Sequence, residues 1–241
     1  MYVTTPYVEI IACTGMPLET IYTAFRQCYF PGDIHTFADD VRHGKVAEEK
    51  QEALIRKVVA SGHESPIEHV SFTFAISGVS RALTHQLVRH RLASYSQQSQ
   101  RYVKMDDLAI VMPDLSYLTE EQQNLAKHAI RTHATMTEVT YRRLEECGVK
   151  AEDCRSVLPN STATSIVVTM NCRSLLNFFQ HRCCYRAQGE INAVARKMLE
   201  LVKVQLPVVF ENAGARCITL KRCPEAKPCG KRPWVEYPVT I

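Results

Sequence analysis

The chain has 241 residues and a formal net charge of +4, with 46% hydrophobic and 22% charged residues. These ordinary globular values exclude a disordered, collagen-like or coiled-coil chain, and the net charge is too small to indicate a nucleic-acid-binding protein. No apolar run approaches the roughly 20 residues of a membrane span, and the first residues lack a secretory signal, so we expect a cytoplasmic protein without a membrane partner.

Helical and strand patterns follow one another irregularly along the chain. Apolar and polar residues alternate strictly from Val70 to Ile76, the pattern of a half-buried strand, and we expect Gly78 to end it. Thr119 and Gln122 form a capping box at the start of the longest predicted helix. In chain order, the sequence predicts a strand at 7–14, helices at 17–28 and 46–61, a strand at 70–76, helices at 80–91 and 119–147, a strand at 163–170, and helices at 173–184 and 188–205.

The few strands among many helices predict an α+β fold, as a single domain with a small mixed sheet flanked by helices. No repeat or long linker interrupts residues 1–213. Residues 214–241 are different, because they are rich in Pro, Cys, Lys and Arg and show no helical or strand period. We therefore expect a domain at 1–213 followed by an extended arm at 214–241, packed on the body or on a neighbouring subunit.

Common site motifs are missing. No two glycines are spaced G-x-G, so the chain has neither a Rossmann fingerprint nor a Walker loop, and it has no G-x-S-x-G motif. The segment His63–His69 reads H-E-x-x-x-E-H, not the zinc motif H-E-x-x-H, and Pro66 disfavours the helix that would align its histidines. Most of the ten cysteines are expected to be reduced, structural thiols. We expect no metal, although the evenly spaced Cys217, Cys223 and Cys229 leave a zinc site as an alternative to plain packing.

The distribution of charge indicates an anion site. No acidic residue occurs between Glu68 and Asp106, or between Asp153 and Glu190. Cations on a solvated face usually alternate with carboxylates, and arginine forks suit phosphates and the carbonyl edges of bases. The two windows therefore predict the walls of a site for anions, with chance clustering and subunit contacts as the alternatives. Their nine cations are Arg81, Arg89, Arg91, Arg101, Lys104, Arg155, Arg173, Arg182 and Arg186.

Residues 89–102 are the most informative stretch. On a helix the side chains of Arg89–Arg91 would point in different directions, so at a helix end they can serve two ligands or the ligands of neighbouring subunits. The polar side chains that follow carry no carboxylate, which is typical of a pocket for a flat polar ring bearing a phosphate. An RNA-binding module that stacks bases on Tyr95 and Tyr102 is the alternative.

Residues 89–99 read R-H-R followed by seven residues and a serine. The chain also contains G-H-E-S-P-x-E-H at 62–69, R-x-V-L-P at 155–159, N-x-R-S-L-x-N-F at 171–178 and A-Q-x-E-I at 187–191. This set of motifs, in this order, resembles the flavin-dependent thymidylate synthases.

The resemblance implies an FAD-dependent methyltransferase of de novo dTMP biosynthesis, which converts dUMP to dTMP. Methylenetetrahydrofolate would supply the carbon, FAD would carry the hydride and NADPH would reduce the flavin. The family also implies a non-Rossmann α+β fold and a homotetramer whose active sites lie between subunits.

The resemblance further implies the site residues. Arg182 falls where the family stabilises negative charge on the uracil ring, which is its expected catalytic role. A nucleophilic role for Ser99 is the alternative to a positioning contact, and we favour the contact because no adjacent side chain can accept its proton. Gln97 stands where some members have a glutamate, which puts any role that requires a carboxylate in doubt. The expected dUMP contacts are Gln86, Arg89, Gln97, Ser99, Gln100, Arg101, Arg155 and Arg182. The expected FAD contacts are Ser65, Arg89, His90, Arg91, Gln97, Asn171, Arg173 and Asn177.

Overall fold

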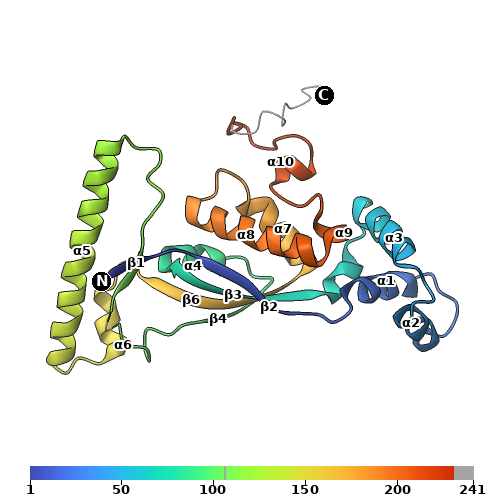
Figure 1. Cartoon of the computed structure of the whole chain (residues 1–241), viewed down its shortest axis with the longest axis horizontal. Coiled ribbons are helices and arrows are strands. Elements are labelled where there is room, and N and C mark those ends of the chain that lie inside the picture. Colours follow the sequence, from blue (N-terminus) through green and yellow to red (C-terminus); the bar gives the residue numbers. More distant parts are fainter. Residues whose placement is uncertain (106, 231–241) are drawn as a thin grey trace.

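The computed structural model describes residues 1–105 and 107–230. Its strands form two sheets, and helices lie on one side of the larger sheet and at both ends of the molecule (Figure 1). The strands are β1 (Tyr2–Thr4), β2 (Tyr7–Cys13), β3 (Ser71–Ser80), β4 (Ser94–Gln97), β5 (Ala109–Val111) and β6 (Ala163–Asn171). The helices are α1 (Pro17–Gln27), α2 (Ile34–Arg42), α3 (Glu48–Ala60), α4 (Arg81–Leu87), α5 (Glu120–Glu146), α6 (Ala151–Cys154), α7 (Cys172–Arg182), α8 (Gly189–Gln205), α9 (Pro207–Phe210) and α10 (Arg216–Thr219), with 3-10 turns η1 (Ser65–His69) and η2 (Arg155–Val157).

The larger sheet is antiparallel, with the strand order β2-β3-β6-β4. Strand β3 continues past Gly78, because its register against β6 shifts between Ile76 and Val79. Gly78 has a φ of +65°, and a Cβ at this position would collide with the carbonyl oxygen of Thr5. The prediction that Gly78 ends the strand is therefore wrong, since this glycine serves an irregularity inside it.

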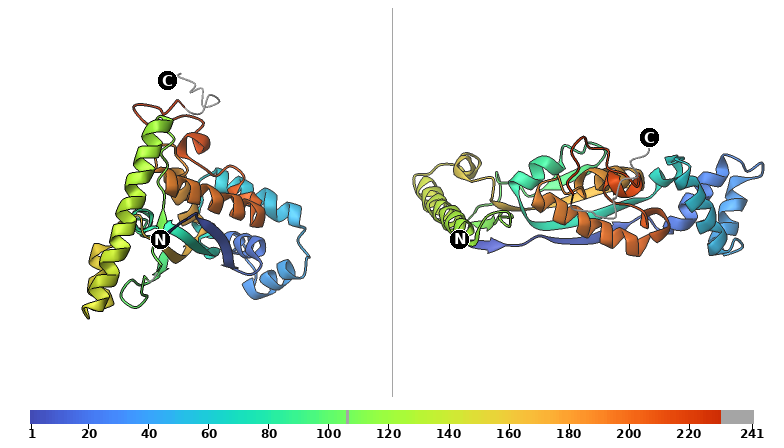
Figure 2. Two further views of the ribbon diagram at one scale, coloured as in Figure 1. Left: turned by 60° about the vertical axis from the view of Figure 1, so that its left-hand side comes forward. Right: turned by 90° about the horizontal axis from the view of Figure 1, so that it is seen from above.

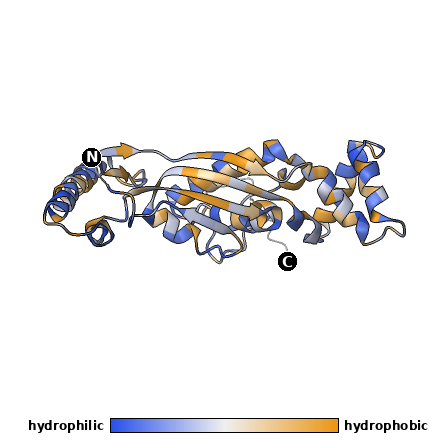
Figure 3. Cartoon of the chain, turned by 90° about the horizontal axis from the view of Figure 1, so that it is seen from below, coloured by the Kyte–Doolittle hydropathy of each residue, from blue (hydrophilic) through white to orange (hydrophobic). Residues whose placement is uncertain are grey.

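The larger sheet buries one face. Helices α4, α7 and α8 cover that face, whereas none of the described helices lies over the opposite face (Figures 1 and 3). Phe72 and Phe74 of β3 point into the covered side, where both are fully buried, and the ring of Phe210 meets Phe72 edge-on at 6.0 Å. Between them Thr73 faces the open side, where its hydroxyl lies 2.9 Å from that of Thr169 on β6. The strict alternation in the sequence is thus the alternation between core and open face.

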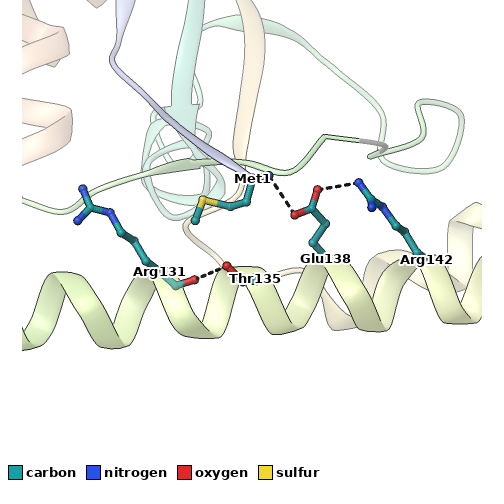
Figure 4. Close-up of polar contacts among 5 residues, drawn as sticks. All are labelled: Met1, Arg131, Thr135, Glu138 and Arg142. Carbon is teal, nitrogen blue, oxygen red and sulfur yellow. Dashed lines mark hydrogen bonds and ion pairs between the residues drawn. The ribbon is translucent and has the colours of Figure 1, made fainter.

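The smaller sheet pairs β1 with β5 in parallel and lies beside α5, at the end of the molecule opposite α1, α2 and α3 (Figure 2). The ammonium group of Met1 donates to Glu138 on α5 at 3.0 Å, and Arg142 donates to the other carboxylate oxygen at 3.1 Å (Figure 4). One turn earlier, the Thr135 hydroxyl donates to the carbonyl of Arg131 at 3.1 Å. The Met1–Glu138 contact joins α5 to the start of the chain, whereas the other two lie within α5. No helix within the described residues is long and apolar enough to cross a bilayer.

The structure confirms the α+β class. In place of the single mixed sheet that we expected, the strands form one antiparallel sheet and a separate parallel pair. The capping box of Thr119 and Gln122 is present at the start of α5, and the predicted strands and long helices occur with small shifts at their ends. The helix predicted at 80–91 begins as expected, since Ser80 accepts the N–H of Leu83, but it ends at Leu87. The sequence does not predict α2, α6, α9, β1, β4 or β5. In the predicted arm, residues 216–219 form α10, and residues 231–241 lie outside the described part of the chain.

Candidate active site

The Arg89–Arg91 segment lies in the turn between α4 and β4, not on a helix. The Tyr95 hydroxyl holds this turn, because it lies 2.9 Å from the carbonyl oxygen of Leu87 and 2.7 Å from that of His90 and shares its proton between them. Burial raises the pKa of Tyr95 to about 12, so the hydroxyl stays a donor. A turn, and not the helix we expected, therefore sets the directions of the three side chains.

The His90 side chain is half-buried behind this turn. Its Nε2 lies 2.7 Å from the Ser174 hydroxyl, and its ring meets Phe178 edge-on at 5.5 Å. Burial lowers the pKa of His90, and the nearby His181 and Arg182 lower it further. The imidazole is therefore neutral near neutral pH.

Arg89, His90 and Arg182 line a cavity of about 520 Å³ at the C-terminal end of α7, called the Arg182 cavity below. The Nη2 of Arg182 donates to the carbonyl oxygen of Gln86 at 3.2 Å, and Asn192 donates to the carbonyl oxygen of Arg182 at 2.8 Å. Among the described residues Arg182 has no carboxylate within ion-pair distance. Its guanidinium group is thus oriented by the protein and keeps N–H donors for a ligand.

A second cavity, of about 580 Å³, adjoins the first, since Asn177 and Gln180 line both. Arg173 lies in this second cavity, where its Nε is 3.3 Å from Glu64 and its Nη1 pairs with Glu68. These carboxylates raise the pKa of Arg173, with Glu68 the larger cause. Two acidic groups around one cation leave this cavity without net positive charge.

Three other expected flavin contacts have local roles. Asn171 caps α7, because its Oδ1 accepts the N–H of Ser174 at 2.9 Å, and it lines the second cavity. Gln97 donates to the Thr84 hydroxyl at 2.9 Å, which joins β4 to α4. Ser65 begins η1 and is exposed beside the second cavity's Glu64. Neither Gln97 nor Ser65 lines the two cavities.

A further group of donors surrounds the loop after β4, which we call the β4 loop (residues 98–101). The Nη2 of Arg81 donates to the carbonyl oxygen of Gln98 at 2.8 Å, and burial together with the charge of Arg155 lowers the pKa of Arg81. The Nε of Arg81 and the Nε2 of Gln100 are buried and find no hydrogen-bond partner among the described residues. Buried donors without partners beside two arginines suit an anion. The sequence placed Arg81 in an acid-free window but not in the site.

The expectation that the cations of the acid-free windows lack acidic partners is wrong for four of the nine. Their partners come from distant parts of the sequence, so the windows do not reveal them. The ion pairs are Arg101–Glu152 at 2.9 Å, Lys104–Glu145 at 3.4 Å, Arg173 with Glu64 and Glu68, and Arg186–Glu225 at 3.2 Å.

The expected dUMP contacts fall into two groups within one chain. The first group belongs to the Arg182 cavity, and the second belongs to the β4 loop and to η2, which directly follows α6 in the chain. Members of the second group line neither of the two cavities. The first group is Arg89 and Arg182, which line the cavity, with Gln86, whose carbonyl oxygen holds Arg182. The second group is Ser99, Gln100, Arg101 and Arg155, with Arg81 added by the structure. Gln97 belongs to neither group, since it lies on β4 and donates to Thr84 of α4.

The cysteines do not form a metal centre in the described residues. Among residues 1–105 and 107–230, no group of three His, Cys, Asp or Glu side chains has an arrangement that could hold a metal ion. No disulfide bond joins the ten cysteines, which include Cys217, Cys223 and Cys229.

Comparison with known proteins decides the family. The model of the thymidylate synthase complementing protein family matches residues 9–208. A flavin-dependent thymidylate synthase of Nitratidesulfovibrio vulgaris is 50% identical over 242 residues, which cover 95% of this chain and 96% of that protein. The chain belongs to the flavin-dependent thymidylate synthase family.

Two further comparisons agree with this membership. The flavin-dependent thymidylate synthase of Clostridium tetani is 43% identical over 93% of both chains. A crystal structure of the UMP/dUMP methylase PolB from Streptomyces cacaoi, bound with 5-Br dUMP, superposes with a TM-score of 0.74 at 25% identity, over 88% of this chain and 96% of that one. All the expected site residues of this family member lie within the matched range 9–208, whereas the arm lies beyond it.

Proposed function

We propose that this chain catalyses the reductive methylation of dUMP to dTMP, with methylenetetrahydrofolate as carbon donor and NADPH as reductant. The bound FAD supplies the hydride-carrying chemistry. The observation that carries this proposal is the guanidinium group of Arg182, which faces a cavity and has no acidic partner among the described residues.

Arg182 acts on the uracil ring. Methylation at C5 requires electron density to move toward that carbon, and an arginine that donates to the ring carbonyl and ring nitrogen stabilises the charge that develops. A planar fork can donate two parallel hydrogen bonds, and preorganised charge is usually the largest catalytic contribution. The bond from Arg182 to the Gln86 carbonyl holds the fork in place before substrate binds. The neutral His90 adds no competing charge.

The β4 loop binds the phosphate of dUMP. Arg81 and Gln100 offer buried donors without partners among the described residues, and Arg155 adds a second positive charge. The Ser99 hydroxyl accepts the N–H of Arg101 at 3.1 Å, which supports a positioning contact for Ser99 and not a nucleophilic role. Arg101 reaches the phosphate only by sharing or leaving its ion pair with Glu152.

The two adjoining cavities fit an extended cofactor such as FAD. Asn177 lines both of them and would contact the middle of the cofactor. The cavity of Arg173 carries two carboxylates, which suit hydroxyl and amine donors, so the FAD diphosphate needs other cations. Arg89 and Arg91 in the turn before β4 meet that need. The residues proposed to hold FAD are Ser65, Arg89, His90, Arg91, Gln97, Asn171, Arg173 and Asn177.

A homotetramer with active sites between subunits completes this site. The second group of expected dUMP contacts lines neither cavity within one chain, so a neighbouring subunit would supply it. The open face of the larger sheet and the exposed Leu125 and Met136 of α5, with 66% and 59% of their surfaces accessible, support such an assembly. Folate and NADPH would enter the shared site. In this proposal residues 1–213 are the catalytic domain and residues 214–241 an arm, and the end of the family match at residue 208 supports that division.

The proposal is tested on the purified protein. We expect a yellow protein with a flavin absorption band, which forms dTMP from dUMP when methylenetetrahydrofolate and NADPH are both present. Omitting either co-substrate should stop turnover. A colourless protein that forms no dTMP and binds RNA with strong salt dependence would refute the proposal in favour of an RNA-binding module.

A further inference from the structure

The arm after the family-matched region forms one wall of the Arg182 cavity. Arg216, Cys223 and Glu225 line the cavity from the arm, opposite Arg182 and Cys184 of the body. The family match ends at residue 208, so this wall lies outside the matched region. The cavity next to the proposed catalytic arginine is therefore lined in part by a segment beyond that region.

The arm is attached to the body at its beginning. Gly214 starts the arm, and a Cβ on it would lie 2.6 Å from the Cδ1 of Ile218, so the two residues are in close contact. Cys217 of α10 is buried in the core, and Ile218 and Cys223 pack against that core. This first attachment is apolar and firm.

A second attachment lies farther along the arm and is polar. The Nη1 of Arg186 is 3.2 Å from the carboxylate of Glu225, and it also donates to the carbonyl oxygen of Lys227 at 3.2 Å. The side chains of Arg186 and Glu225 are 53% and 45% exposed, so water and salt weaken this ion pair. Arg186 follows Arg182 by four residues, in the turn after α7. A weak attachment next to the catalytic group can open and close reversibly.

We propose that residues 214–230 are a lid on the Arg182 cavity, and that Arg186 and Glu225 are positioning residues that hold the lid closed. The apolar attachment at α10 is the fixed end of the lid, and the Arg186–Glu225 pair is its latch. The role of the lid in admitting dUMP rests on the proposed function, whereas its opening and closing do not.

The opening of the lid is measured by alkylating thiols with iodoacetamide and following each cysteine by mass spectrometry. Glu225→Gln removes the ion pair, and we expect Cys184 and Cys223 to react about two- to five-fold faster, the effect of losing one exposed ion pair. The exposed Cys147 is the internal reference, and the fully buried Cys172 should stay unreactive. The matched control is Glu200→Gln, which breaks an exposed pair with Lys197 on α8 at the same distance of 3.2 Å, and neither residue of that pair lines the Arg182 cavity. Equal rates at Cys184 and Cys223 in the wild type, Glu225→Gln and Glu200→Gln would overturn the lid.

Restoring the latch separates positioning from general destabilisation. The double variant with Arg186→Glu and Glu225→Arg re-forms an ion pair of reversed polarity and should bring the alkylation rates back toward the wild-type values. In turnover assays Glu225→Gln should raise KM for dUMP about two- to five-fold with kcat nearly unchanged, and the double variant should lower KM again. An unchanged KM beside faster alkylation would overturn the role of the lid in substrate access. A wild-type protein that forms no dTMP would refute the proposed function, while the alkylation rates would still decide whether the lid exists.

Discussion

Arg182→Lys separates charge from geometry in the proposed catalytic step. Arginine has five N–H donors in a planar fork, and one of them is used on the Gln86 carbonyl, which leaves a fixed edge for the uracil ring. Lysine keeps the positive charge but offers a single point on a flexible stem, so it cannot hold Gln86 and present two parallel donors at once. Loss of one preorganised donor costs about 10²–10³ in kcat, or about 2.7–4 kcal/mol. We expect Arg182→Lys to lose dTMP formation by this factor.

The assay follows two half-reactions of the same preparation. Flavin bleaching by NADPH without dUMP should be nearly unchanged, because that step needs no uracil, and the flavin content should be normal. Arg216→Lys is the matched control, since Arg216 lines the same cavity from the arm and has no proposed role in catalysis. Wild-type dTMP formation by Arg182→Lys, or loss of flavin instead of turnover, would refute the role of the fork.

Four further predictions follow from the site. Ser99→Ala should keep measurable turnover and lose about 0.5–1.5 kcal/mol of dUMP binding free energy, measured by titration. Complete loss of turnover with normal dUMP binding would instead favour Ser99 as a nucleophile. Arg81→Ala should weaken dUMP binding by about 1.5–3 kcal/mol while the flavin stays bound, and unchanged binding would remove Arg81 from the site. Light scattering with flavin quantitation should find a tetramer, and a stable monomer with full FAD content would contradict a site between subunits. Burial lowers the pKa of His90, so below about pH 6.5 the unfolded chain binds a proton at this residue more readily than the folded chain does. The folded protein should therefore lose stability as the pH falls below about 6.5. His90→Gln should reduce that loss, measured by denaturant unfolding at several pH values.

The sequence carries the motifs and the long elements of this protein because both depend on local spacing. The alternation in residues 70–76 reports which side of β3 meets the core, and the capping box of α5 lies within four consecutive residues. The end of α4 is different. Nothing near Leu87 stops a helix, and the turn is held by the hydroxyl of Tyr95, a tertiary contact that has no local signature.

Two features of the site depend on residues far apart in the sequence. Strand β4 has only four residues, with Tyr95 as its one aromatic, and it exists because it pairs with β6, so no apolar period could predict it. Arg173 pairs with Glu68, which lies 105 residues earlier in the sequence. The acid-free window around Arg173 predicts a positively charged site, but this distant carboxylate offsets the charge of Arg173. For Arg81 the sequence understated the role in the site. Only its burial beside Arg155 distinguishes Arg81 from an ordinary arginine at the start of a helix, and that burial is a tertiary property.

The division of the dUMP contacts between two regions of the chain bears on mixtures of subunits. In the proposed homotetramer, a chain damaged at Arg182 still carries an intact β4 loop, and a chain damaged at Arg155 still carries an intact Arg182 cavity. When two such chains assemble together, some sites combine the sound half of each, so two inactive proteins mixed before assembly regain activity that neither has alone. By the same arrangement a chain with one damaged half inactivates only the site to which it contributes that half, so an intact neighbour keeps a working site of its own.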